Sequence, residues 1–491
     1  MKILLIDIDT LRPDHLGCYG YHRNTSSHID SICKDSVRFT QCFASDTPCL
    51  PSRAAFHSGR FGFHNGAINH GGAYADKYKE GITRKFHTSE ENRQFVEVLR
   101  RNGYYTASVT SFADRHSAWW FYAGFNEIYN CGKDGHETAD EVTPKALEML
   151  DNSNKKENWF LHYNIWDPHR PYRTPKYVEN PFKDEPIATW VTQEMIDKHQ
   201  QSFGPHSANA PLDAPWLDKP THREVKEIKN LDDYKTWIDG YDVGIRYADA
   251  HVGKMVQKLK DLGIYEETAI IITSDHGENQ GELNIYGDHH TADLITNRVP
   301  MIIKWPGVEP GRNSAFHYQF DISATILGLA GLVVPGKWDG KSFKDAFLRS
   351  SENGREFLIL SHAPWSCQRS VLFGDHILIR TYMDGLKELP EYMLFNWKKD
   401  PHELNNLVDQ KPEFIDKGRS ILNDWEREQL ASSKEHEDPM RKVIEEGGPF
   451  HTRGNLPEYI IYYQSINRQE IAEKMRKRYT GIKGYEKGVD E

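Results

Sequence analysis

The sequence predicts an α/β protein built on a large, doubly wound, mostly parallel sheet with helices on both faces. It also predicts a smaller C-terminal α+β subdomain with an antiparallel sheet. Two observations indicate this class. In residues 1–350, uninterrupted apolar runs, typical of strands buried on both faces, alternate with helix-like patterns. In residues 351–491, the runs become shorter and are separated by turns, as in antiparallel sheets.

Five apolar runs in the first domain, residues 1–350, predict parallel strands. They are residues 2–8, 105–109, 159–165, 269–273 and 300–305. Helical periodicity occurs between them, at residues 92–102, 142–150 and 241–262. Strands that alternate with helices in this way favour a sheet covered on both faces.

Two segments depart from this alternation. Residues 177–239 are polar, rich in Pro, Trp and His, and lack a clear period. We expect them to form an insertion over the active-site face, either a substrate lid or a plain surface excursion. In the C-terminal subdomain, residues 351–491, short strands are predicted at 357–361, 370–373, 377–381 and 392–395, followed by a helix at 412–429.

Composition limits the class of partner. The net charge of -11 argues against nucleic acid or an anionic membrane as the main partner, so an anionic substrate needs a local cationic site. No stretch approaches the roughly 20 apolar residues that a membrane-spanning helix requires. The chain begins with a strand-like run and shows no secretory leader, so we expect a cytoplasmic protein, with a leader that has been trimmed away as the alternative.

Polar residues follow the carboxyl ends of the predicted strands, where α/β sheets bind ligands. Asp9 ends the first strand, Asp167 and His169 follow residues 159–165, and Asp275 and His276 follow residues 269–273. Hard cations such as Ca²⁺ and Mg²⁺ prefer carboxylate oxygens. A lone Asp after a strand is commonly a helix cap or turn former, whereas several at one sheet edge predict a metal site.

The run T-P-C-L-P-S-R, residues 47–53, is the most specific motif in the chain. A cysteine followed by X-P-S-R is the signal that a maturation enzyme recognises before it converts the cysteine to Cα-formylglycine. The bland interpretation is a loop cysteine beside a turn, since Pro and Ser both favour turns. The run resembles the active-site signature of the type I, formylglycine-dependent sulfatases, which belong to the alkaline-phosphatase-like superfamily.

Further motifs extend this resemblance over most of the chain. D-T-L-R-P-D-H-L-G-C-Y-G at residues 9–20 and T-S-D-H-G-E at 273–278 resemble the two metal-binding segments of the family. V-P-M-I-I-K-W-P-G at 299–307 resembles the strand that follows, and K-D-P-H-E-L-N-N-L at 399–407 resembles the C-terminal subdomain. The resemblance implies an alkaline-phosphatase-like fold and hydrolysis of a sulfate ester, which we expect to lie on a sugar or glycan fragment.

The resemblance also implies a role for each matching residue. Cys49 becomes formylglycine, whose hydrate supplies the oxygen that attacks sulfur, and Arg53 holds that diol. One divalent cation, Ca²⁺ or alternatively Mg²⁺, is held by Asp9, Asp275, His276 and the modified Cys49. The expected partners are therefore a small sulfated substrate and a formylglycine-generating maturation enzyme.

Three histidines complete the predicted catalytic set. His169, in W-D-P-H-R-P-Y, matches a histidine that contacts the sulfate or the leaving oxygen. His289 stands where many members have a sulfate-binding lysine, and its charge depends on pH near neutrality. The usual G-K-W-H segment is replaced by S-F-A-D-R-H at 111–116, so its lysine–histidine role goes to Arg115 and His116. A packed histidine is an equally good interpretation of His116.

Other departures keep alternatives open. Many sulfatases have a second Asp where this chain has Thr10, and Asp7 either compensates or is purely structural. His276 replaces the more frequent Asn, as in formylglycine-dependent phosphonate monoester hydrolases. A phosphonate monoester or phosphodiester hydrolase is therefore the alternative function, although Leu50 and Ser52 fit the sulfatase signature better. A binding protein with an unconverted cysteine is a third possibility, which the metal ligands disfavour.

Aromatic residues near these motifs offer faces on which a sugar ring can stack, although single tryptophans are more often core residues. They are Trp119, Trp120, Tyr122, Trp166 and Trp365.

Overall fold

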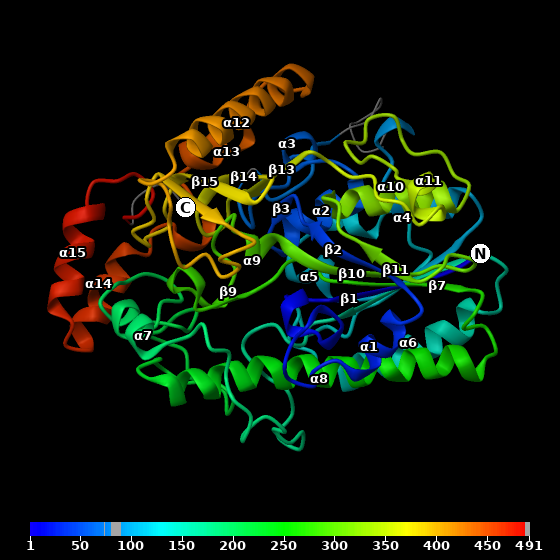
Figure 1. Cartoon of the computed structure of the whole chain (residues 1–491), viewed down its shortest axis with the longest axis horizontal. Coiled ribbons are helices and arrows are strands. Elements are labelled where there is room, and N and C mark those ends of the chain that lie inside the picture. Colours follow the sequence, from blue (N-terminus) through cyan, green and yellow to red (C-terminus); the bar gives the residue numbers. More distant parts are fainter. Residues whose placement is uncertain (73, 80–89, 487–491) are drawn as a thin grey trace.

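A nine-stranded sheet forms the centre of the computed structural model, which describes residues 1–72, 74–79 and 90–486 (Figure 1). The strand order is β11-β2-β10-β7-β1-β6-β4-β5, and β12 pairs with β2. The strands are β1 (Lys2–Ile8), β2 (Val37–Phe43), β4 (Tyr105–Val109), β5 (Glu127–Tyr129), β6 (Trp159–Ile165), β7 (Thr268–Thr273), β10 (Arg298–Lys304), β11 (Gly311–Asn313) and β12 (His317–Tyr318). The predicted α/β class is confirmed.

Strand direction agrees with the prediction at four of the five predicted strands. β1 lies between β6 and β7 and is parallel to both, and β4 is parallel to β6 and β5. β10, predicted as a parallel strand at residues 300–305, is antiparallel to both β7 and β2, so this part of the prediction was wrong. Burial on both faces produces the same uninterrupted apolar run in either direction.

Helices cover both faces of the sheet (Figure 1). One layer contains α1 (Ser27–Cys33), α6 (Ala139–Ser153) and α8 (Leu231–Asp261), and the other α2 (Cys49–Ser58), α4 (Phe95–Arg101), α10 (Gln319–Leu329) and α11 (Lys344–Leu348). The side chains of β1 alternate between the two cores, with Leu4 and Ile6 in one and Ile3 and Leu5 in the other. Short helices α3 (Gly62–Asn65), α5 (Phe112–Arg115), α7 (Gln193–Gln200) and α9 (Leu294–Asn297) lie in the connections.

Helix α8 begins earlier than predicted. The predicted helix starts at residue 241, whereas the observed helix starts at Leu231, within the predicted insertion 177–239, and its buried face already includes Tyr234, Trp237 and Ile238. The side chain of Asn230 accepts hydrogen bonds from the backbone N–H groups of Asp232 and Asp233, which caps the first turn.

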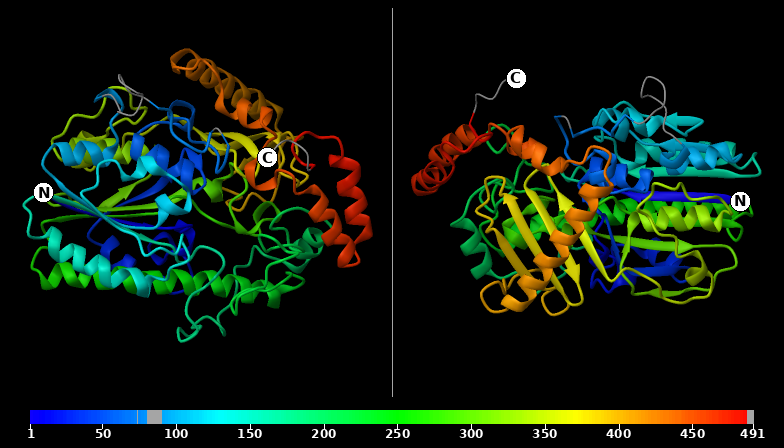
Figure 2. Two further views of the ribbon diagram at one scale, coloured as in Figure 1. Left: turned by 180° about the vertical axis from the view of Figure 1, so that it is seen from behind. Right: turned by 90° about the horizontal axis from the view of Figure 1, so that it is seen from above.

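A second, five-stranded sheet has the order β16-β15-β14-β13-β3, as predicted for an antiparallel subdomain. Its strands are β13 (Phe357–His362), β14 (Cys367–Phe373), β15 (His376–Met383), β16 (Tyr392–Asn396) and the short β3 (Asp46–Thr47). Figure 2 shows helix α12 (Pro412–Ser432) lying across this sheet. Strand β3 is parallel to β13 and directly precedes the Cys49 segment, so the subdomain is joined to that segment by main-chain pairing.

The last helices return to the first domain. They are α13 (Pro439–Glu445), α14 (Leu456–Ser465) and α15 (Gln469–Tyr479). Residues of α14 and α15 share an apolar cluster with Phe203 and Leu386, which places both helices beside α7 (Figure 1). A two-stranded ribbon, β8 (Asn279–Gln280) and β9 (Tyr286–Asp288), follows β7. Within the described ranges, every helix is too short or too polar to cross a membrane.

Candidate active site

Cys49 is the first residue of helix α2 and is 2 % exposed. Its Sγ atom stands where the side-chain oxygen of a formylglycine would lie, 3.1 Å from Nε2 of His276. Ser52 anchors the helix by donating a hydrogen bond of 2.6 Å to the backbone oxygen of Asp275. The free N–H groups and the dipole of a helix N-terminus favour an anion at this position.

Arg53 gathers three carboxylates beneath Cys49. Its guanidinium donates to Oδ2 of Asp7 at 2.9 Å, to Oδ2 of Asp9 at 3.0 Å and to Oδ2 of Asp275 at 2.5 Å. Asp9 and Asp275 meet because they end β1 and β7, which are neighbours in the sheet. Burial, followed by the charge of Asp275, raises the pKa of Asp9 well above its usual value. Three carboxylates around one guanidinium leave an excess of negative charge.

The four predicted cation ligands lie together. The ligand atoms of Asp9, Cys49, Asp275 and His276 are all within 4.8 Å of one another, and all four residues are buried. Oδ1 of Asp9 is buried and lacks a hydrogen-bond partner within the described ranges. Nδ1 of His276 donates to the backbone oxygen of Gly277 at 2.8 Å, which leaves the Nε2 lone pair directed at Cys49. This donor set fits a divalent cation, whereas Asp7 lies outside it.

His289 and His169 lie next to this group. The ring centroid of His289 is 4.2 Å from that of His276 and 6.0 Å from that of His169. Burial, followed by the charge of His276, lowers the pKa of His289 well below its usual value. Its Nδ1 is buried and has no hydrogen-bond partner among the residues described. Within the described residues, His289 therefore has a side-chain nitrogen free to hydrogen-bond to a group bound beside His276.

The segment that replaces the usual lysine–histidine pair also reaches the site. The Arg115 guanidinium lies 5.1 Å from the ring centroid of Trp166 and donates to the backbone oxygen of Asp134 at 2.8 Å. Arg115 makes no ion pair with a carboxylate of the described residues, so its charge is available to an anion. Nε2 of His116 is buried and lacks a partner in the same ranges. Its environment fits both interpretations, because the ring also packs on Phe112 at 5.2 Å.

A cavity of about 580 Å³ opens from Cys49 and is lined by Arg115, His116, His169 and His289. Asp134, His136, Arg170, Pro171, Asp288 and Trp365 also line it. Further lining comes from two distant parts of the chain, the predicted insertion and the C-terminal segment, residues 450–486. These residues are Asp213, Ala214 and Trp216 in the first case and Phe450, His451 and Asn455 in the second, and His70 joins them. Sequence reasoning missed them because no motif marks these positions.

Two of the five predicted sugar-stacking aromatics, Trp166 and Trp365, are buried against other residues. The Trp166 ring lies near the guanidinium groups of Arg53 at 5.6 Å and Arg115 at 5.1 Å. The Trp365 ring stacks on His290 at 4.2 Å and on His451 at 4.6 Å. Trp166 and Trp365 are only 2 % and 8 % exposed, so little of either ring is open to a sugar.

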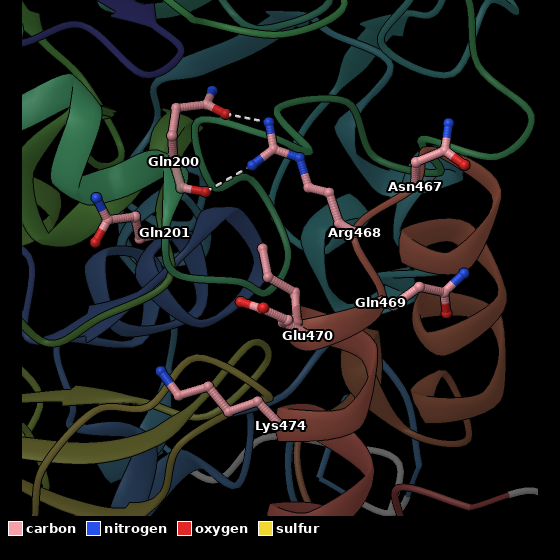
Figure 3. Close-up of a pocket in the computed structure, with 8 residues that line it drawn as sticks. Gln200, Gln201, Asn467, Arg468, Gln469, Glu470 and Lys474 are labelled. Atoms are coloured by element: carbon pink, nitrogen blue, oxygen red, sulfur yellow. Dashed lines mark hydrogen bonds between the residues drawn. The ribbon is translucent and has the colours of Figure 1, made fainter.

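A separate hollow of about 720 Å³ lies between the end of α7 and helix α15 (Figure 3). Arg468 crosses it and donates two hydrogen bonds to Gln200, and Glu470 and Lys474 line the same helix face. None of the predicted site residues lines this hollow, whereas Cys49, Arg115, His116, His169 and His289 all line the other cavity.

Comparison with known proteins agrees with this geometry. The family model described as sulfatase matches residues 2–332, and a model described as N-sulphoglucosamine sulphohydrolase, C-terminal, matches residues 281–423. Human iduronate 2-sulfatase is 25 % identical over 430 residues, which cover 72 % of this chain and 73 % of that protein. A solved structure in complex with its substrate D-glucosamine-2-N,6-O-disulfate superposes with a TM-score of 0.65 at 18 % identity, covering 90 % of this chain and 99 % of that one.

The fold and the Cys49 site define an alkaline-phosphatase-like hydrolase. The chain belongs to the sulfatase family and is a sulfuric ester hydrolase, in a family that uses formylglycine and a divalent metal. A phosphonate monoester hydrolase from Silicibacter pomeroyi has the same TM-score of 0.65 at 18 % identity and covers 88 % of this chain and 95 % of its own. That similarity shows the fold alone, and the sulfatase activity is the better supported of the two.

Proposed function

We propose that this sulfatase removes sulfate from a sulfated carbohydrate, using a formylglycine made from Cys49 and a calcium ion. The observation that carries the proposal is the position of Cys49 at the N-terminus of α2, within 4.8 Å of the ligand atoms of Asp9, Asp275 and His276. A nucleophile precursor, an anion-favouring helix end and a hard-cation donor set coincide there.

The hydrated formylglycine supplies the nucleophilic oxygen, and the cation polarises the sulfate oxygens when it is bound. Asp9, Asp275 and His276 would hold that cation. Carboxylate oxygens favour Ca²⁺ or Mg²⁺, and we propose Ca²⁺ because it accepts irregular ligand arrangements more readily. Arg53 remains bound to Asp7 and keeps a positive charge beside the nucleophile.

The residues that line the cavity would bind the sulfate and protonate the leaving alcohol. Arg115 has no carboxylate partner in the described ranges and would neutralise the negative charge of the sulfate. His116 and His289 each have a buried nitrogen that lacks a hydrogen-bond partner among the described residues, and each would hydrogen-bond to the sulfate or to the oxygen of the leaving alcohol. His169 is a further candidate to protonate that alcohol, because its ring centroid lies 6.0 Å from that of His289.

The carbohydrate substrate is proposed from the relatives and from the size of the cavity. Human iduronate 2-sulfatase is named for a sugar sulfate, and the superposed structure contains a sulfated glucosamine. The cavity of about 580 Å³ is several times larger than a sulfate ion and has room for a sugar ring.

The proposal is tested by converting and then removing Cys49. Protein from a host with a formylglycine-generating maturation enzyme should lose about 18 Da at the Cys49 peptide, or show almost no change if the aldehyde is hydrated. Cys49→Ala should release no sulfate from 4-nitrophenyl sulfate or from sulfated sugars. Cys131→Ala, which alters a partly buried cysteine outside the site, is the matched control and should retain activity. Full turnover by Cys49→Ala would refute the mechanism.

A further inference from the structure

Two histidines that are 381 residues apart meet in the lining of the cavity. His70 follows helix α3, and His451 belongs to the C-terminal segment, residues 450–486. Nδ1 of His70 lies 2.8 Å from Nε2 of His451, so the two rings share one hydrogen bond. Neither residue belongs to a motif of the family.

Both rings are held in place by their neighbours. His451 stacks on Trp365 with ring centroids 4.6 Å apart, and its backbone N–H donates to the oxygen of Pro364 at 2.9 Å. His70 packs on His116 at 4.9 Å, which places the pair next to the expected sulfate-binding residues. Burial lowers the pKa of His451 to about 4 and that of His70 well below its usual value, so both rings are neutral near pH 7.

The hydrogen-bonding capacity of this pair is incomplete. Nε2 of His70 is buried and has no hydrogen-bond partner within the described ranges. If His451 donates within the pair, Nε2 of His70 carries a proton and must donate; if His70 donates, its Nε2 must accept. A hydroxyl group satisfies either state, whereas a carboxylate or sulfate satisfies only the first. A buried, unpaired imidazole nitrogen is costly, so a ligand that pairs it gains affinity.

We propose that His70 and His451 form a hydroxyl-binding subsite for the sugar that carries the sulfate. This inference rests on the proposed carbohydrate sulfatase function and adds the determinant of its selectivity. Phe450, which is 43 % exposed, and Trp216 line the same cavity and offer apolar faces to the C–H groups of a sugar ring. The C-terminal segment would thus select sugars that present a hydroxyl beside the sulfate ester.

The test measures binding without turnover, by calorimetry on Cys49→Ala protein loaded with Ca²⁺. The probes are N-acetylglucosamine 6-sulfate, galactose 6-sulfate and glucosamine 2-N,6-O-disulfate, with methyl sulfate as the probe that lacks a sugar. His451→Phe in this background keeps the ring on Trp365 and removes both nitrogens. This variant should lower the affinity for the tightest-binding sugar about tenfold, which corresponds to the loss of one hydrogen bond. The affinity for methyl sulfate should change much less. His70→Phe should have the same effect, and His70→Gln, which keeps a donor and an acceptor, a smaller one.

The matched control is His22→Gln, because His22 is exposed and its one hydrogen bond to the described residues goes to the backbone oxygen of Pro186. It should leave the affinity for every probe unchanged. The inference is overturned if no sugar binds more tightly than methyl sulfate. It is also overturned if His451→Phe and His70→Phe, folded by circular dichroism, leave the sugar affinity unchanged or weaken methyl sulfate equally. Hydrolysis of 4-nitrophenyl sulfate by the wild-type enzyme tests the proposed function separately, so either idea can fail alone.

Discussion

The decisive residues of the site are one buried arginine and the three buried aspartates that it contacts. Arg53 contacts Asp7, Asp9 and Asp275, yet one positive charge cannot compensate three carboxylates away from water. The unpartnered Oδ1 of Asp9 shows where the hydrogen bonding is incomplete. A divalent cation would supply both the missing positive charge and the missing partner of Asp9. Removal of a carboxylate should therefore affect metal binding only where that carboxylate belongs to the ligand group.

Asp275→Asn should lower cation binding and turnover together. Asp275 belongs to the ligand group and also accepts N–H groups of Thr10 at 3.3 Å and His276 at 3.0 Å, so its replacement disturbs both sides of the site. We expect turnover to fall at least about 100-fold, with metal content by mass spectrometry falling in parallel. Asp7→Asn should retain the metal and lose less activity, because Asp7 lies outside the ligand group. Asp375→Asn, on the exposed surface, is the control, and an Asp275→Asn enzyme with normal metal content and turnover would contradict the assignment.

At the scale of elements, the sequence predicted position better than direction. The apolar runs of β1, β4 and β6 coincide with the observed strands because buried parallel strands consist of little else. The apolar run of β10 did not indicate whether the strand is parallel or antiparallel to β7, because that depends on the connection between the two strands. The early start of α8 was missed although Tyr234, Trp237 and Ile238 extend its buried apolar period towards the Asn230 cap.

The segment K-D-P-H-E-L-N-N-L, residues 399–407, has a structural explanation that its sequence did not give. His402 lies 2.9 Å from Oε1 of Glu282, and Arg12 donates to the same oxygen at 2.9 Å. The adjacent Glu403 accepts the N–H of Leu294 at the start of α9. The buried carboxylate of Glu282 thereby joins the C-terminal subdomain to Arg12 of the first metal-binding segment.

Glu282→Gln should destabilise the fold in a pH-dependent way. Burial alone would raise the pKa of Glu282, but Arg12 and His402 lower it to about 2. Because the folded pKa lies below the usual value, the carboxylate stabilises the fold above about pH 4.5 and loses this effect as pH falls towards 2. We expect wild type and Glu282→Gln to differ by about 2–3 kcal/mol at pH 7 and by clearly less at pH 3.

Urea unfolding at pH 7, 4 and 3 measures this difference. Glu266→Gln is the matched control, because Glu266 is largely exposed and only approaches Lys304 at 3.5 Å. A Glu282→Gln difference that stays constant across this pH range would contradict the assignment of the stabilising charge.

At the scale of the whole molecule, the cavity is assembled from parts of the chain that no motif connects. Cys49, His169 and His289 could be found from sequence because each belongs to a family motif at the end of a strand or helix. His70, His451 and Trp216 could not, because they come from the loop after α3, the turn before α14 and the insertion, which only the tertiary fold brings together. The chemistry of the site is thus local in sequence, whereas the recognition surface depends on tertiary packing.

Tyr463 is the residue through which this packing can be tested. Its hydroxyl accepts the backbone N–H of Gly204 at 3.1 Å and donates to Oδ1 of Asn209 at 2.9 Å, which ties α14 to the insertion. Tyr463→Phe leaves the buried Gly204 N–H unpaired, at a cost of about 1–3 kcal/mol. Hydrogen exchange across residues 203–216 should therefore accelerate, with weaker binding of sulfated sugars because Trp216 is held less firmly. The control is Tyr392→Phe, because the Tyr392 hydroxyl has no hydrogen bond to the described residues; it should change neither hydrogen exchange nor sugar binding. Unaltered exchange in Tyr463→Phe would show that other contacts hold the insertion to the C-terminal helices.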